Sequence, residues 1–154
     1  MNNDNTTNPL LEPQSNNGPS VDNALSVKLE FNKWNNVKIH LELHGRQPNP
    51  SQTEIWWAGV GRNLGTEIHG KNSRFARPVI IYKKLSRYNF MAIPLTSREH
   101  TGSWYVSFNQ NGVLETAMLH QAKTMNVKRL YSRIGKIDDE DMKRIRKAFI
   151  ELYG

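Results

Sequence analysis

The chain of 154 residues contains no cysteine, and this absence removes several classes of protein. Disulfides cannot form, and zinc ribbons, iron–sulfur sites and cysteine nucleophiles all need thiolates. The five histidines and the carboxylates remain as the side chains able to bind a metal ion. Because a chain without thiols suits a reducing compartment, we expect a cytoplasmic location.

Long apolar runs are also missing. No stretch approaches the roughly 20 apolar residues that span a bilayer. The first 20 residues are polar, without the basic start and the apolar segment of a secretory signal. We therefore expect a protein that is not exported and has no membrane partner.

Acidic residues are scarce relative to basic ones. There are 14 Asp and Glu against 21 Lys and Arg, so the net charge is +7. Residues 1–53 carry four basic and five acidic side chains, whereas residues 54–154 carry seventeen and nine. Because a basic surface attracts polyanions, we expect the C-terminal two-thirds to bind nucleic acid or an acidic protein.

The composition divides the chain into a tail, an extension and one domain. Residues 1–22 are rich in Asn and Pro and poor in aliphatic residues, which predicts a disordered tail. Residues 23–53 are predicted to form a helical extension and a linker. Apolar spacing favours a helix at the start of 25–44, while its second half, with Leu41 between polar neighbours, fits a helix or a strand. Residues 54–154 form the remaining domain, whose size suits one core.

Within residues 54–154, short apolar segments alternate with turn residues, the pattern of a small barrel or sandwich. The chain ends in an amphipathic helix: Asp138 is a suitable N-cap, and Met142, Ile145 and Phe149 continue one apolar stripe that we expect to pack on the sheet. The predicted strands are Glu54–Val60, Arg77–Lys83, Asn89–Pro94, Ser103–Asn109, Thr116–Met125 and Arg129–Ile134.

A long loop, residues 61–76, leads into the second predicted strand and carries three glycines and several cations. Arg77 precedes Pro78 at the point where this loop enters the strand, and Thr96 and Ser97 follow the next strand. Taken singly, these residues have ordinary explanations, because Arg77 can pair with Glu67 and paired hydroxyls form turns.

The histidines are better candidates for proton transfer than for metal binding. His40 and His44 would align on a helix, but they lack the spacing of known metalloprotease motifs. His69 in the long loop and His120, predicted to lie in a strand, can both titrate near neutral pH.

Five short motifs follow one another along residues 54–154: Glu54-Ile55-Trp56-Trp57, Gly65-Thr66-Glu67, Arg77-Pro78-Val79, Pro94-Leu95-Thr96-Ser97, and His120-Gln121 followed by Arg129-Leu130. Their order and spacing resemble the MazF/PemK family of toxins from type II toxin–antitoxin systems. The stretch Phe31-x-x-Trp34-Asn35-x-x-Lys38 resembles a helical extension in one branch of that family.

The resemblance implies a mainly β (α+β) fold, an SH3-like small β-barrel of the CcdB/PemK type with a C-terminal helix and an N-terminal helical extension. It further implies a homodimer that cuts single-stranded RNA, uses no metal ion or other cofactor, and is held by a cognate acidic antitoxin. Cleavage without metal requires the ribose 2′-hydroxyl to attack the adjacent phosphorus. The site must then provide a proton acceptor, a cation for the phosphorane and a proton donor.

By resemblance, the two residues with catalytic roles are Arg77 and Thr96. A guanidinium is too basic to act as the base but clamps phosphate oxygens well. Some family members have an Arg and an Asp on a later strand where this chain has Met118 and His120, and a loop His where it has Thr66. His120 is therefore the third catalytic candidate, and His69 is the alternative base. The candidate substrate-binding residues are Glu67, His69, Lys71, Arg74, Ser97 and Gln121, with Phe75 available for base stacking.

Two rival interpretations share this fold pattern. One is a non-enzymatic toxin of the CcdB type that binds DNA gyrase, and the other is a passive nucleic-acid-binding barrel. The pair Arg77 and Thr96 favours the nuclease, because neither rival needs it.

Overall fold

The computed structural model describes residues 20–154, and the predicted tail of residues 1–22 lies outside them except for its last three residues. Ser20 is the N-cap of helix α1 (Val21–His44) and accepts a hydrogen bond from the Asn23 N–H at 3.3 Å. The helix therefore begins two residues before the predicted end of the tail, because Ser20 stabilises its first turn.

The ambiguous second half of the extension is helical. Trp34 and Leu41 are the buried residues of α1, and they lie seven positions apart, which places them on one face after two turns. Ile39 and Leu43, which alternate with Leu41 in the sequence, are 49% and 69% exposed. Because Leu41 is buried on the same helical face as Trp34, this segment packs as a helix and not as a strand.

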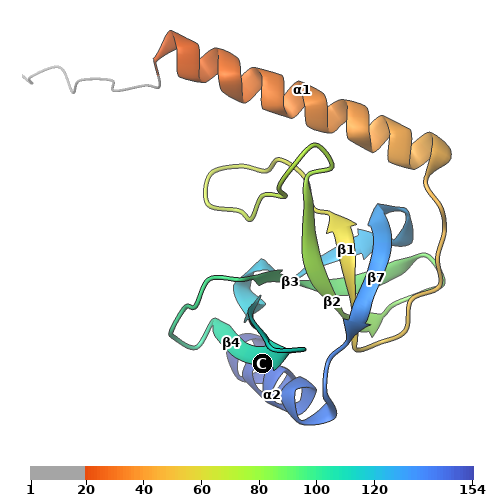
Figure 1. Ribbon diagram of the computed structural model, residues 1–154, viewed down its shortest axis with the longest axis vertical. Coiled ribbons are helices and arrows are strands. Elements are labelled where there is room, and N and C mark those ends of the chain that lie inside the picture. Colours follow the sequence, from red (N-terminus) through yellow and green to blue (C-terminus); the bar gives the residue numbers. More distant parts are fainter. Residues whose placement is uncertain (1–19) are drawn as a thin grey trace, which may run out of the picture.

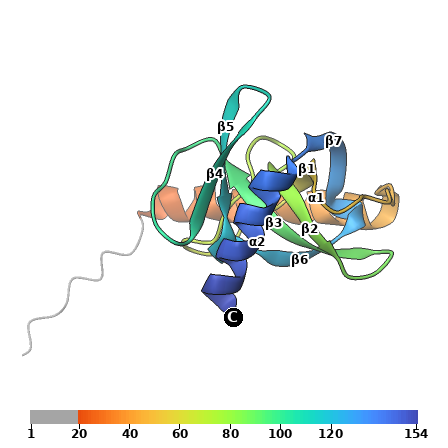
Figure 2. The ribbon, with the colours of Figure 1, turned by 90° about the horizontal axis from the view of Figure 1, so that it is seen from below.

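The domain after the linker is an antiparallel sheet with one helix on each side. Figure 1 shows α1 above the sheet and α2 (Asp139–Tyr153) below it, and Figure 2 shows α2 lying across the sheet. The other elements are β1 (Glu54–Gly59), β2 (Ala76–Lys84), β3 (Asn89–Thr96), β4 (Tyr105–Gln110), β5 (Val113–Met118), the 3-10 turn η1 (Leu119–Gln121), β6 (Lys123–Asn126), the 3-10 turn η2 (Val127–Arg129) and β7 (Leu130–Lys136).

The strand order is β4-β5-β3-β2-β1-β7, and β6 pairs with β3. This is the predicted α+β fold of the CcdB/PemK type, with the correction that the sheet does not close into a complete barrel. Its two ends, β4 and β7, are not paired in the described residues. A side chain bridges them instead, since the Gln110 amide donates to the Lys136 carbonyl at 3.3 Å.

The strand predicted over Thr116–Met125 is interrupted. Both β5 and β6 pair with β3, but three residues of η1 lie between them, and the register moves from Leu95 opposite Ala117 to Ala92 opposite Lys123. The inserted turn removes residues 119–121 from the ladder. His120 therefore lies in a 3-10 turn, whereas the sequence pattern predicted a strand.

Side chains on the two faces of the sheet fill two cores. On the α2 side, Ile80, Ile93 and Leu119 pack with Met142 and Ile145, which confirms the predicted stripe of the last helix. Asp138 is the N-cap residue of α2, but its side chain makes no capping hydrogen bond. The core on the other face lies beneath the long loop and η2 and consists of Ala58, Val60, Val79, Ile81, Phe90, Ala92, Met125, Val127 and Leu130.

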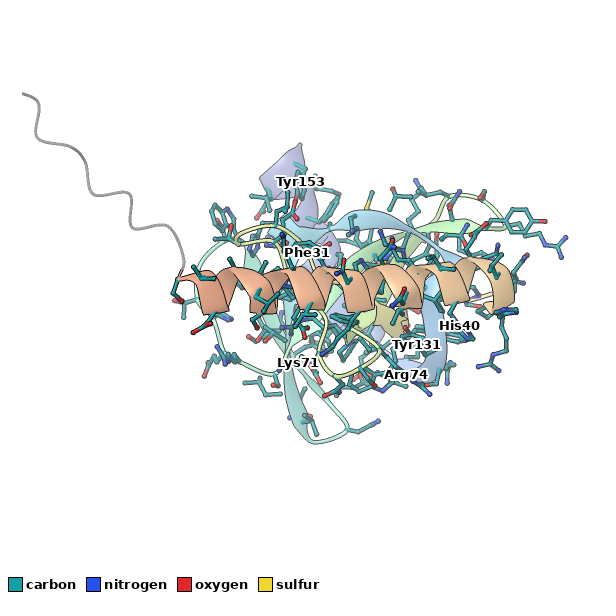
Figure 3. All side chains as sticks on the ribbon, turned by 90° about the horizontal axis from the view of Figure 1, so that it is seen from above. Phe31, His40, Lys71, Arg74, Tyr131 and Tyr153 are labelled. Carbon is teal, nitrogen blue, oxygen red and sulfur yellow. The ribbon has the colours of Figure 1, made fainter. Side chains whose placement is uncertain are left out.

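Helix α1 rests on the loop side of the domain through few side chains. Trp34 packs on Phe75 with ring centroids 5.6 Å apart, and together with Leu41 they form a small third core. Figure 3 shows the helix spanning the domain, with Arg74 and Tyr131 beside its C-terminal half. Within residues 20–154, neither α-helix combines the length and the apolar character needed to cross a bilayer.

Candidate active site

Arg77 and Thr96 lie at the same end of the β2–β3 pair. Val79 of β2 is paired with Pro94 of β3, the last pair between these strands at this end, and Arg77 and Thr96 each lie two residues beyond it. Arg77 is also paired with Ala58 of β1. Val79 and Pro94 are directly opposed and share a face, and side chains two residues apart in a strand point the same way, so the backbone directs Arg77 and Thr96 to one face.

The same line continues through two more strands. Thr96 is paired with Thr116 of β5, and Thr116 with Ser107 of β4. The Thr116 and Ser107 hydroxyls are 2.9 Å apart and hydrogen bonded. We call Arg77, Thr96, Thr116 and Ser107 the polar row. It sets one guanidinium beside three hydroxyls on a single face.

Arg77 is held by one edge of its guanidinium. Its Nε donates a short hydrogen bond to the His69 carbonyl, its only side-chain hydrogen bond within residues 20–154. The side chain is half-buried, and burial lowers its pKa, with a smaller contribution from the charge of Arg98. A guanidinium remains protonated despite such a shift. Its two terminal nitrogens are thus free to form a fork on an anion.

Thr96 is the last residue of β3 and is 7% exposed. Its Oγ1 accepts a hydrogen bond from the Arg98 N–H at 3.3 Å. The hydroxyl proton is therefore left to donate. Ser97, the neighbouring candidate, is exposed at the start of the following turn.

The His69 ring is built into the loop. Its Nδ1 accepts the Asn63 N–H at 2.9 Å, and Arg62 Nη1 lies 2.7 Å from Nε2. Burial lowers the pKa of His69, and the charges of Arg62 and Arg77 lower it further. Because Nδ1 accepts the Asn63 N–H, it cannot also carry a proton, so the imidazole is neutral and serves to position the loop.

Glu67 and Gln121 also hold the loop. The Gln121 side chain accepts the Ile68 N–H at 3.0 Å and donates to the Thr66 carbonyl at 3.2 Å. A Glu67 carboxylate oxygen accepts the Leu64 N–H at 2.8 Å. Ile68 and His69 are adjacent, so Gln121 of η1 and Arg77 of β2 are tied to one short piece of loop.

His120 lies in a small cavity beside this loop. The cavity has a volume of about 280 Å³ and is shared with Glu67, Gln121 and Lys123. Burial lowers the pKa of His120, and its Nδ1 is buried without a hydrogen-bond partner in the described residues. A neutral imidazole with an unoccupied nitrogen is suited to accept a proton.

Aromatic side chains hold the His120 ring. Trp104 stacks on it with centroids 5.0 Å apart, and Tyr105 meets it edge-on at 5.2 Å. Trp104 is 51% exposed. The adjacent pair Trp104-Tyr105 was the sequence signal for this cluster, but nothing in the sequence connected it with His120.

Lys71, Arg74 and Phe75 lie at the far end of the loop. Lys71 and Arg74 are exposed, and Arg74 stacks over Tyr131 of β7 at 5.2 Å. Phe75 is 4% exposed and packs on Trp34, so the expectation that it is available for base stacking is wrong. Its ring is occupied because α1 covers this part of the loop.

Sequence reasoning missed Thr116, Ser107 and Lys123. The first two reach the polar row only through strand pairing, and no local pattern reveals cross-strand neighbours. Burial lowers the pKa of Lys123, with a further contribution from Arg129. Its ammonium lines the His120 cavity, where a cation can bind an anion.

The fold and the site together define a small basic α+β domain whose candidate site combines one guanidinium with three hydroxyls on an antiparallel sheet. Residues 51–153 match the family model described as PemK-like, MazF-like toxin of type II toxin–antitoxin system. The chain belongs to this family. No curated protein matches it in sequence.

Solved structures show the same fold at low identity. MazF from Deinococcus radiodurans is 17% identical with a TM-score of 0.59, over 70% of this chain and 98% of that one. An endoribonuclease in complex with its cognate antitoxin, from a mycobacterial species, is 16% identical with a TM-score of 0.55, over 68% and 95%. A MazE–MazF structure from Deinococcus radiodurans is 14% identical with a TM-score of 0.54, over 70% and 97%.

Proposed function

We propose that this chain, a toxin by family, is an endoribonuclease that cleaves single-stranded RNA without a metal ion. The 2′ oxygen of a ribose forms a bond to the adjacent phosphorus while the bond from phosphorus to the 5′ oxygen breaks. The products are a 2′,3′-cyclic phosphate and a free 5′-hydroxyl. One proton leaves the 2′-hydroxyl for a base, and the 5′ oxygen takes one from solvent.

The observation that carries this proposal is that Arg77 and Thr96 each lie two residues beyond the same β2–β3 pair, Val79 and Pro94. Arg77 is fixed through Nε, so its free terminal nitrogens can hold two phosphate oxygens and stabilise the charge that grows on them. The Thr96 hydroxyl donates a hydrogen bond to the same phosphate and keeps the phosphate aligned for attack. Neither a gyrase-binding toxin nor a passive barrel needs this arrangement.

His120 is proposed as the proton acceptor. Its lowered pKa keeps it neutral, and its ring is fixed by Trp104 and Tyr105. Lys123 and Ser97 are proposed to contact the RNA, whereas Glu67, His69 and Gln121 act by holding the loop that positions Arg77.

The partners follow from the family. The mycobacterial neighbour is in complex with its cognate antitoxin, and we propose that an acidic antitoxin binds the basic face of this chain and competes with RNA. A homodimer is also proposed. Size-exclusion chromatography with light scattering tests the dimer, and slower cleavage in the presence of antitoxin tests the competition.

The deciding experiment incubates the purified chain with single-stranded RNA in EDTA, beside an oligomer that has 2′-deoxy sugars throughout. The proposal is supported if the RNA is cleaved and leaves cyclic phosphate ends while the deoxy oligomer stays intact. Arg77→Ala should lower the rate by about 10²–10³, the typical loss for one transition-state donor. Arg87→Ala, which removes an exposed cation stacked on Tyr88, is the matched control. Binding without cleavage would identify a passive barrel, and gyrase inhibition without cleavage a toxin of the CcdB type.

A further inference from the structure

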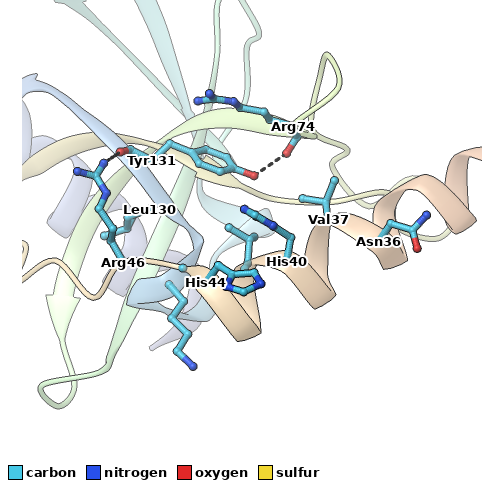
Figure 4. A pocket seen from close by; sticks show the side chains of 11 residues that line it. Asn36, Val37, His40, His44, Arg46, Arg74, Leu130 and Tyr131 are labelled. Carbon is cyan, nitrogen blue, oxygen red and sulfur yellow. Dashed lines mark hydrogen bonds between the residues drawn. The ribbon is translucent and has the colours of Figure 1, made fainter.

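Helix α1 forms a groove with the domain that the site above does not use. One cavity of about 500 Å³ lies between the C-terminal half of α1, the tip of the long loop, η2 and β7 (Figure 4). A second cavity of about 430 Å³ adjoins it, and Arg74 and Tyr131 line both. We call the two together the α1 groove. Because α1 lies outside residues 51–153, the wall that α1 contributes to the first cavity is an addition to the part that matches the family model, whereas the residues of the second cavity lie within that part.

The α1 groove is lined by cations and by no carboxylate. Arg46, Arg74 and Lys128 reach it from the linker, the loop and η2, and no Asp or Glu of the described residues lines either cavity. Arg46 is fixed by a hydrogen bond to the Tyr131 carbonyl at 2.8 Å. Glu42 pairs with Lys128 at 3.3 Å but is exposed and outside the lining. An anion entering the groove therefore meets three cationic side chains in the lining and no carboxylate.

Flat side chains line the same groove. The Arg74 guanidinium lies on the Tyr131 ring at 5.2 Å, and because Arg74 is exposed its outer face is free. His40 and His44 present their rings one helical turn apart, with centroids 5.2 Å from each other. Trp57 in the second cavity is 41% exposed. Rings and guanidinium planes are the surfaces on which unpaired bases stack.

The second cavity adds neutral hydrogen-bonding groups. Asn72, Ser73 and Ser132 line it beside Trp57 and Tyr131. Amides and hydroxyls next to an aromatic wall suit the edges of a base, whereas an acidic peptide would need further cations there. Each cavity also has the volume of a site for a small molecule or one nucleotide.

The geometry points to a second RNA site: the α1 groove binds nucleotides that flank the one held at Arg77, their phosphates on Arg46 and Lys128 and a base on Arg74 and Tyr131. This inference rests on the proposed function. Arg74 and Arg77 lie three residues apart, so their Cα atoms are at most about 11 Å apart, and one strand can pass from the polar row over the loop tip into the groove.

Binding of 2′-O-methyl RNA, which cannot be cleaved by its own 2′ oxygen, tests this site. We compare oligomers of about 6 and about 20 nucleotides, which bracket common footprints on single strands, by fluorescence anisotropy at several salt concentrations. For the double variant Arg46→Gln with Lys128→Gln, affinity for the long oligomer should fall about tenfold. Its salt slope should fall by about 1.4, which is about 0.7 for each lost phosphate contact. Affinity for the short oligomer should stay the same.

The matched control is Lys143→Gln with Lys147→Gln, an equal loss of charge on the exposed side of α2. A second groove variant, His40→Gln with His44→Gln, changes exposed side chains of α1 and tests the site without disturbing Arg46 or its bond to β7. It should also weaken binding of the long oligomer only.

The inference is overturned if the control loses as much affinity as the groove variants, if the groove variants bind the long oligomer like the wild type, or if the wild type binds neither oligomer. It is also overturned if the groove variants lose binding of a glutamate-rich peptide and keep that of RNA, which would assign the groove to an acidic protein. Cleavage of unmodified short RNA is measured separately. A wild type that binds the long oligomer through the groove without cleaving RNA would refute the proposed function alone.

Discussion

The indole of Trp34 lies directly over Gly61, so close that a Cβ on Gly61 would stand 2.5 Å from Trp34 Cε2. Gly61 begins the long loop with a φ of +101°, a backbone angle that side-chain-bearing residues rarely adopt. The next residue, Arg62, lies over the Phe31 ring at 5.1 Å and beside the His69 ring. The backbone carbonyl of His69 in turn accepts the hydrogen bond that holds Arg77. A continuous set of contacts therefore joins α1 to the proposed catalytic arginine.

Gly61→Ala should destabilise the protein and slow cleavage. The added methyl group meets the Trp34 ring, and the backbone angle costs about 1–3 kcal/mol for a non-glycine residue. Thermal unfolding measures the loss of stability. Gly65→Ala is the control, since Gly65 also has a positive φ but has nothing within 4 Å of its Cβ position. Equal effects of the two substitutions would show that the contact with Trp34 is unimportant.

Trp34→Ala should loosen α1 and the loop together. Removing a buried tryptophan costs about 3–5 kcal/mol, and here it also removes the surface that supports Phe75 and Arg129. Hydrogen exchange should become faster in α1 and in residues 61–75, and cleavage should slow because Arg77 loses its fixed position. Leu43→Ala, at a position 69% exposed on the same helix, should change neither. Unchanged protection of the loop would contradict the connection.

Thr96→Val should reduce cleavage with little effect on folding. The two side chains have nearly the same shape, and the exchange removes the hydroxyl that we propose to contact the phosphate. We expect a loss of about tenfold to a hundredfold in kcat, which corresponds to about 1.4–2.7 kcal/mol of transition-state stabilisation, whereas Thr96→Ser should retain most activity. Single-turnover kinetics with excess enzyme give the comparison. Equal rates for the valine and serine variants would remove Thr96 from the site.

The pH dependence of cleavage should report His120. Burial lowers its pKa below the usual 6.5, so the base is already free at neutral pH. Activity should fall only when the pH drops below about 6.5, the ordinary value for histidine. His120→Gln should abolish this acid limb together with most of the rate. A wild-type limb retained in the variant would assign the base elsewhere.

Stability should also fall with acid in the same range. His69 and His120 both have lowered pKa values in the folded chain, so between the lowered and the ordinary value the unfolded chain binds more protons than the folded one. The free energy of unfolding therefore rises with pH across that window and decreases as the pH falls below about 6.5. Urea unfolding at a series of pH values measures the slope, which should be shallower in His69→Gln. An unchanged slope in that variant would show that His69 does not contribute.

Local patterns were sufficient for the elements that are decided by short-range packing. The apolar stripe of α2 and the strands around Ile80 and Ile93 follow from spacing alone, because their apolar residues recur every few positions. The interruption at η1 was missed, since residues 119–121 have the composition of a strand and leave the ladder only because β3 must be paired along two segments with different registers.

The sequence by itself determined the class of the protein: a basic domain without thiols, its order of motifs, and Arg77 and Thr96 as the chemical candidates. Only the tertiary structure decided how those candidates are held. Strand pairing brought Arg77 and Thr96 to the same end of β2 and β3 and joined Thr96 to Thr116 and Ser107, because antiparallel register joins residues far apart in the chain. Docking of α1 buried Phe75 against Trp34 and completed the first cavity of the α1 groove, because these outcomes depend on which surfaces meet, and no local pattern records that.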